Sequence, residues 1–123
     1  MLENPRKFEA GTDPFGRKWR AELRWIQNAI SIRHADAVDV KWELTCDDGE
    51  VVEKVVALYH PDLLALSKKQ GQPLTDSWCI RLAAEHVRAL VSNWEDAEKT
   101  IVVPSPEQLE IYAGQALPAR AGR

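Results

Sequence analysis

The chain has 123 residues, 45% hydrophobic and 28% charged, with a net charge of −3. This length suits one domain with a sizeable core, and the composition is the ordinary balance of a soluble protein. The first residues lack the basic start and apolar core of a secretion signal, no apolar run has membrane-spanning length, and the two cysteines are far apart. We therefore expect a reduced, cytoplasmic protein, with residues 1–123 as a single domain, no membrane partner, no metal site and no cofactor.

Charge is distributed unevenly along the chain. Residues 5–33 carry seven basic and three acidic side chains, a net +4, whereas residues 36–62 carry two basic and eight acidic ones, a net −6. If these segments pair across neighbouring strands, their charges neutralise each other. If they are exposed separately, they form a two-signed surface that could recognise a partner or a second copy. We favour the first arrangement, because charged patches are usually solvated faces.

The N-terminal third predicts an extended arm followed by a strand. Residues 1–16 contain two prolines and two glycines, which predicts an extended arm. Phe8 and Phe15 could hold this arm against the rest of the domain. From residue 19 onward, apolar and charged residues alternate, which predicts a strand with its tryptophans inward and its arginines outward. Helical spacing also fits residues 19–30, and we favour the strand because the alternation continues over residues 30–33.

The strongest strand signal lies in residues 38–58. Apolar and polar residues alternate strictly from Val38 to Asp47, and a β-branched run over residues 51–56 follows. Asp47-Asp48-Gly49 between them predicts a tight turn, because glycine favours the positive φ that such turns need. Residues 34–36 are expected to form the turn into the first of these strands.

After residue 58 the period becomes helical. Pro61 predicts the start of a short helix that Gly71 ends. Thr75 is a good N-cap for the longest helix, which we expect to end near Ala97 with one apolar face. Residues 100–103 suggest a short edge strand. A capping box at residues 105–108 starts a last helix that runs to about residue 113, with Gly114 closing it and a disordered tail over residues 115–123.

These elements together predict an α+β fold. We expect an antiparallel sheet of three to four strands in the N-terminal half, covered on one face by two to three helices from the C-terminal half.

One short motif has a family resemblance. Tyr59-His60-Pro61-Asp62 follows the apolar residues 55–58 and resembles the signature of J-domain cochaperones, which stimulate heat-shock chaperone ATPases. In that family the motif lies in a loop between two antiparallel helices, so the resemblance implies a helix before residue 60. The lysine and asparagine that commonly follow the motif are missing here. A helix that starts after a strand also explains these residues.

No catalytic signature is found. Cys79 and His86 are nearly two helical turns apart, about 10 Å along the axis, which is too far for a nucleophile and its base. An enzyme would need residues brought together by the fold, such as His34, Asp36 and His60 with His86. The sequence therefore favours a non-catalytic role and predicts no catalytic residue.

Five tryptophans in 123 residues point to an interface. Trp78, Leu82 and Ala89 fall on the helix side opposite the main apolar face, and a helix that is apolar on two sides either sits between layers or meets another chain. Aromatic and arginine side chains are the usual anchors of interfaces. We therefore expect a small interaction module that binds another protein or a second copy of itself through Trp78, Arg81, Leu82 and Ala89.

Nucleic acid is the alternative partner. Arg17, Lys18, Arg20 and Arg24 lie beside Trp19 and Trp25, a combination in which bases could stack on the rings while the cations meet phosphates. The overall acidic charge and the inward direction expected for the tryptophans both argue against this alternative.

Overall fold

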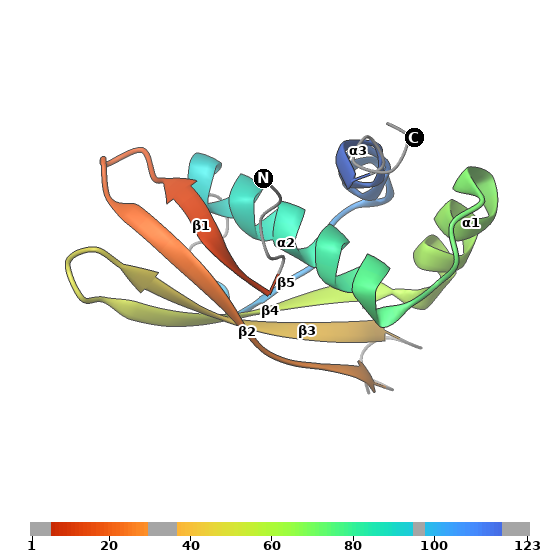
Figure 1. The fold of residues 1–123 in the computed structure, drawn as a ribbon, viewed down its shortest axis with the longest axis horizontal. Coiled ribbons are helices and arrows are strands. Elements are labelled where there is room, and N and C mark those ends of the chain that lie inside the picture. Colours follow the sequence, from red (N-terminus) through yellow and green to blue (C-terminus); the bar gives the residue numbers. More distant parts are fainter. Residues whose placement is uncertain (1–5, 30–36, 95–97, 117–123) are drawn as a thin grey trace.

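A computed structural model describes residues 6–29, 37–94 and 98–116, which form a five-stranded sheet and three helices (Figure 1). The elements in chain order are β1 (Lys7–Thr12), β2 (Lys18–Ala29), β3 (Ala37–Cys46), β4 (Val51–Tyr59), α1 (His60–Gln70), α2 (Asp76–Asn93), β5 (Ile101–Val102) and α3 (Pro106–Ala116). The predicted α+β class is confirmed. Residues 1–5 of the expected arm and residues 117–123 of the expected tail lie outside the described residues, as does the predicted turn at residues 34–36.

The sheet has the order β1-β2-β3-β4-β5 and is mixed. Neighbours from β1 to β4 are antiparallel, whereas β5 runs parallel to β4. The prediction of a purely antiparallel sheet of three to four strands was therefore wrong. A parallel pair needs a long crossover, and α1 with α2 supplies it between β4 and β5. A two-residue strand carries too little periodicity for the sequence to show its direction.

The N-terminal segment belongs to the sheet instead of forming only an arm. Lys7–Thr12 pairs with β2 as an edge strand. Phe8 is buried with its ring edge-on to Trp42, at 5.5 Å between centroids, while Phe15 is 71% exposed. The strand prediction for residues 19–30 is confirmed as far as Ala29.

The turn between β3 and β4 forms as predicted. Gly49 has a φ of 96°, and its N–H donates to the carbonyl of Cys46 at 2.9 Å. This positive φ is easy for glycine and strained for residues with a Cβ.

Two of the three helix ends differ from the prediction. Gly71 ends α1 in the left-handed region as expected, with a φ of 65°. However, α2 ends at Asn93 because Trp94 takes the left-handed position, with a φ of 56°, so the predicted end near Ala97 was wrong. In addition, α3 continues through Gly114 to Ala116, two residues into the expected tail, because glycine inside a helix weakens it without necessarily ending it.

All three helices lie on the same side of the sheet (Figure 1). The longest, α2, crosses the sheet and contacts the first four strands, and α3 packs against α2. Trp19 and Trp42 are fully buried in the core between sheet and helices. Within the described residues, the other side of the sheet has no helix over it, and we call this side the open face.

Candidate interaction surface

A β-bulge in β2 decides which side chains reach the open face. Leu23 is opposite Trp42, but the next partner pair is Trp25 with Lys41, so Arg24 is an extra residue. A bulge places two residues opposite one and shifts the alternation that follows. Trp25 therefore points to the open face and is 39% exposed, and the prediction that it points inward with Trp19 was wrong.

Trp25 begins a row of side chains that crosses four strands. Trp25 is opposite Lys41, Lys41 is opposite Val55, and Val55 is opposite Ile101. The Nζ of Lys41 lies 5.8 Å from the centroid of a Trp25 ring, within cation–π range. Ile101 is 47% exposed, and Val103 just beyond it is also exposed. We call Trp25, Lys41, Val55 and Ile101 the Trp25 row.

A row of glutamates crosses the open face beside the Trp25 row. Glu22 is opposite Glu43, and Glu43 is opposite Glu53. Like charges in directly opposite positions destabilise a sheet unless cations separate them. Arg24 lies 4.0 Å from Glu22 and 3.8 Å from Glu43, and the Nζ of Lys41 lies 3.2 Å from Glu53. Arg24 and Lys41 therefore offset the repulsion within this row.

A shallow depression of about 180 Å³ opens at the β1 side of the glutamate row. Its walls carry both signs of charge and come from β1, β2 and β3. The lining residues are Lys7, Arg20, Ala21, Glu22, Glu43 and Thr45.

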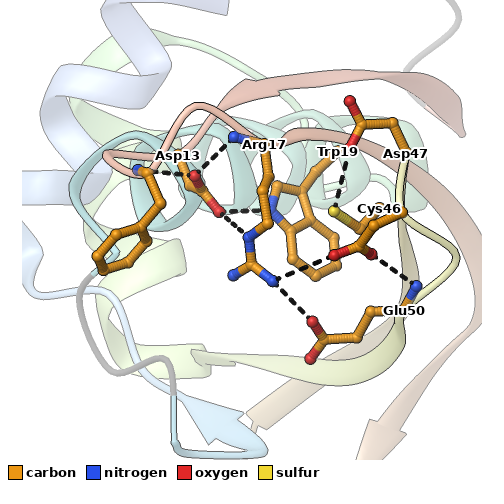
Figure 2. Close-up of polar contacts among 8 residues, drawn as sticks. Asp13, Arg17, Trp19, Cys46, Asp47 and Glu50 are labelled. Carbon is orange, nitrogen blue, oxygen red and sulfur yellow. Dashed lines mark hydrogen bonds and ion pairs between the residues drawn. The ribbon is translucent and has the colours of Figure 1, made fainter.

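A second polar cluster lies at the tip of the sheet and is centred on Asp13 (Figure 2). The Asp13 carboxylate accepts hydrogen bonds from the backbone N–H groups of Phe15 and Arg17, from Arg17 Nε at 2.9 Å and from Trp19 Nε1 at 3.0 Å. The Arg17 guanidinium also donates to Glu50 at 2.8 Å and lies 5.2 Å from the centroids of Trp19 and Trp94 rings. This cluster ties the β1–β2 turn to the β3–β4 turn.

The electrostatics of Asp13 indicate a structural role. Burial alone raises the pKa of this carboxyl, but hydrogen bonds from Trp19, from two backbone N–H groups and from the Arg17 side chain outweigh it. The pKa of Asp13 therefore falls from 3.8 to about 2. A carboxylate with four donors is fixed in its ionised state and is poorly suited to proton transfer.

The predicted nucleic-acid residues do not form a uniform basic surface. Arg17 is committed to Asp13 and Glu50, and Arg24 lies between Glu22 and Glu43. Lys18 and Arg20 are exposed on β2. Because carboxylates lie among these cations, phosphates would meet both signs of charge. Binding of nucleic acid stays an untested prediction.

The predicted partner-binding side of α2 is covered by the chain itself. Trp78 and Leu82 are buried, Ala89 is half-buried against the core, and Arg81 is exposed. A helix that is apolar on two sides either sits between layers or meets another chain, and the burial of Trp78 and Leu82 corresponds to the first of these arrangements. The reason is α3, which packs on α2 and hydrogen-bonds it through Tyr112 and His86, one turn beyond Leu82, at 2.8 Å.

Of the four residues considered for catalysis, the structure describes His60 and His86. His34 and Asp36 lie outside the described residues. His60 is the first residue of α1, and His86 is buried in α2 with the Tyr112 hydroxyl. The residues before His60 form strand β4, so the helix that the J-domain resemblance implies is absent there. Its histidine, proline and aspartate begin a helix after a strand.

Within the described ranges, no group of three or more His, Cys, Asp or Glu side chains is arranged to hold a metal ion. None of the helices described is long and apolar enough to cross a membrane. Comparisons with family models, with curated proteins and with solved structures found no match.

Proposed function

We propose that this protein is a non-catalytic interaction module that binds its partner through the open face of the sheet. The observation that supports the proposal is the Trp25 row, in which Trp25 and Ile101 are exposed, together with the helix layer on the opposite side. Small domains seldom leave a tryptophan and an isoleucine exposed in one row across a sheet unless that surface is used. Aromatic side chains next to arginine are also the usual anchors of protein interfaces.

The proposal relocates the predicted interface from α2 to the sheet. Trp78 and Leu82 stabilise the core from inside, so they are not available to a partner in the folded chain. Trp25 has the properties of an interface anchor, because it is aromatic, exposed and next to Arg24.

Covalent surface labelling read by mass spectrometry tests the proposal. The folded protein is labelled in dilute buffer, at high concentration and in extract from its native host. We expect protection of Trp25 and Ile101 in at least one of the last two conditions. Leu64 and Ile111, exposed on α1 and α3, are matched controls that should stay reactive. Equal labelling of all four residues in every condition contradicts the proposal.

A further inference from the structure

We propose that one edge of β2 accepts an extended segment of another protein, which adds a further strand to the sheet. This inference rests on the proposed function and names the form in which the partner binds beside Trp25. It depends on the backbone register of β1, β2 and β3, and on the side chains in the second half of β2.

β2 is longer than the strand that covers its outer edge. β1 pairs with residues 18–22 of β2, and the hydrogen bond from the Leu23 N–H to the Arg6 carbonyl, at 2.7 Å, ends this ladder. β2 itself continues to Ala29, past the start of β1 (Figure 1). Within residues 6–29, 37–94 and 98–116, no strand pairs with β2 on this side after Leu23. We call the β1 side of residues 25–29 the free edge.

The free edge is already held in the conformation of a strand. On the other side of β2, residues 25–29 pair with residues 41–37 of β3 in five consecutive positions without a shift in register. Because alternate residues of a strand direct their N–H and C=O groups to opposite sides, some of these groups point to the free edge. An extended segment presents donors and acceptors at the same spacing, which is how peptides add to sheet edges. Since β2 is fixed before binding, only the incoming segment has to be ordered.

The free edge lacks the features that keep other strand edges from pairing. Exposed edges are usually protected by charged side chains, proline, bulges or short strands. The outer strand β1 carries the exposed Lys7 and Glu9, and its register shifts after Glu9. At the opposite edge, β5 has two residues, and the part of β4 beside it carries Glu53 and Lys54. Residues 25–29 read Trp-Ile-Gln-Asn-Ala, with no charge and no proline.

Apolar side chains on both faces of the sheet adjoin the free edge. Trp25 is 39% exposed on the open face, and Ile26, opposite Val40, is partly buried on the helix side and packs against the core. A strand laid along β2 would place consecutive side chains beside Trp25 and Ile26 in turn. Aromatic and β-branched residues stabilise such cross-strand pairs. The occupant is therefore an extended segment of about five residues, without proline and with β-branched or other apolar residues at these two positions.

The chain itself supplies poorer strands for the free edge. The residues in line with β1, residues 3–5, read Glu-Asn-Pro, and all three residue types are depleted in strands. A second copy would offer the same five residues 25–29, and their Gln, Asn and Ala bring little apolar or β-branched surface. These compositions favour a segment from another protein.

Hydrogen exchange of the purified full chain, read by NMR, tests strand addition with the peptide acetyl-Thr-Val-Thr-Val-Thr-Val-Thr-amide as the probe. This peptide is β-branched at every position and carries neither charge nor proline. We expect about 1 mM peptide to slow exchange at alternate amides of residues 25–29 about tenfold or more, because the added strand accepts their hydrogen bonds. The outer amides of β1 are the matched control and should be unchanged, since Lys7 and Glu9 protect that edge.

Two N-methylated forms of the peptide separate strand addition from other modes of binding. One form is methylated at its valines and the other at its inner threonines, so each lacks the N–H donors along one edge. We expect one form to bind about tenfold or more weakly than the other, because only one edge of the peptide faces β2. Equal binding of the two forms would overturn strand addition.

A lysine at the free edge should weaken binding of the unmethylated peptide. Trp25→Lys removes the ring beside the added strand and supplies the charge that usually protects an edge, so we expect the dissociation constant to rise about fivefold or more. Leu64→Lys, at an exposed position of α1, is the matched control and should bind normally. Equal affinities of the two variants would overturn the placement beside Trp25. Circular dichroism of both confirms that the fold is retained.

Each outcome decides between the proposals. Amides of residues 25–29 that stay unprotected at about 1 mM peptide overturn strand addition, and protection of Trp25 and Ile101 during surface labelling would then still support the interaction module. Protection that rises with protein concentration alone identifies a second copy. Protection without peptide that disappears when residues 1–5 are removed identifies the chain's own first residues. Either of these results overturns another protein as the source of the strand.

Discussion

Trp25 and Lys41 are direct partners across β2 and β3, and the Lys41 ammonium lies 5.8 Å from the centroid of a Trp25 ring. This pairing exists because Arg24 is an additional residue in β2. Without the bulge, residues 19, 21, 23 and 25 would share one face, and Trp25 would point into the core opposite Val40. The bulge therefore turns what the sequence presents as a core residue into a surface residue.

Deletion of single residues from β2 should show how the bulge sets the register of this strand. Deletion of Arg24 removes the bulge and leaves Trp25 opposite Lys41, so we expect the variant to fold, with Trp25 still exposed to a water-soluble fluorescence quencher. Deletion of Glu22 is the contrasting control, because it places Leu23 on the open face and Arg24 in the core opposite Trp42, and it should destabilise the fold strongly. A Glu22 deletion as well folded as the Arg24 deletion would contradict the register of β2.

The sequence predicted the parts of this fold that have long, regular patterns. The alternation over residues 38–47, the β-branched run over residues 51–56 and the apolar face of the helix after Thr75 are patterns of this kind, and β3, β4 and α2 all form as expected. Phe8 was an indication that the N-terminal segment packs on the rest of the domain, because an apolar aromatic side chain favours burial. The candidate surface could not be predicted, because a one-residue bulge and a two-residue strand change the pattern too little. The cluster of arginine beside tryptophan at residues 24 and 25 was the available signal.

Two leucine substitutions test whether the side of α2 that carries Trp78 and Leu82 is buried. Leu82 is fully buried and Leu64 is 53% exposed. We expect Leu82→Ala to lower the free energy of unfolding by about 2–5 kcal/mol, through lost burial and the cavity left behind. Leu64→Ala, with the same change of side chain, should alter it by no more than about 0.5 kcal/mol. Urea unfolding measures both. A small effect at Leu82 would mean that α3 does not cover this side.

Thr75 should contribute to the stability of α2 as its N-cap. Its hydroxyl accepts a hydrogen bond from the backbone N–H of Trp78 at 3.1 Å. We expect Thr75→Ala to reduce the free energy of unfolding by about 1 kcal/mol, because a helix N–H loses its partner. Ser77→Ala, in the first turn of the same helix and exposed, is the control and should have a much smaller effect in the same urea titration.

Asp13 should make the protein less stable in acid. Its pKa is about 2 in the folded chain and is near 3.8 when the chain is unfolded. A depressed pKa stabilises the folded state fully above the unfolded value, and this contribution is lost as pH falls from about 4 to about 2. Asp13→Asn should therefore unfold more easily at neutral pH and lose less further stability over this acidic range.

Thermal unfolding at a series of pH values measures the effect of Asp13. Glu107→Gln serves as the control, since Glu107 is an exposed carboxylate on α3. Wild-type and Asp13→Asn curves that remain parallel from neutral pH to about pH 2 would show that the four donors do not depress the pKa of this carboxyl.

The two cysteines should be unreactive in the folded chain. Cys46 and Cys79 are both free and buried. Burial raises the pKa of each thiol. The pKa of Cys79 reaches about 11, with a lesser contribution from the negative charge of Asp76. Since the thiolate is the reactive species, we expect very slow modification by iodoacetamide at pH 8 and rapid modification of both residues in urea. Fast labelling of Cys79 without denaturant would show that α2 separates from the sheet in solution, and the buried packing of Leu82 and Trp78 would then have to be transient as well.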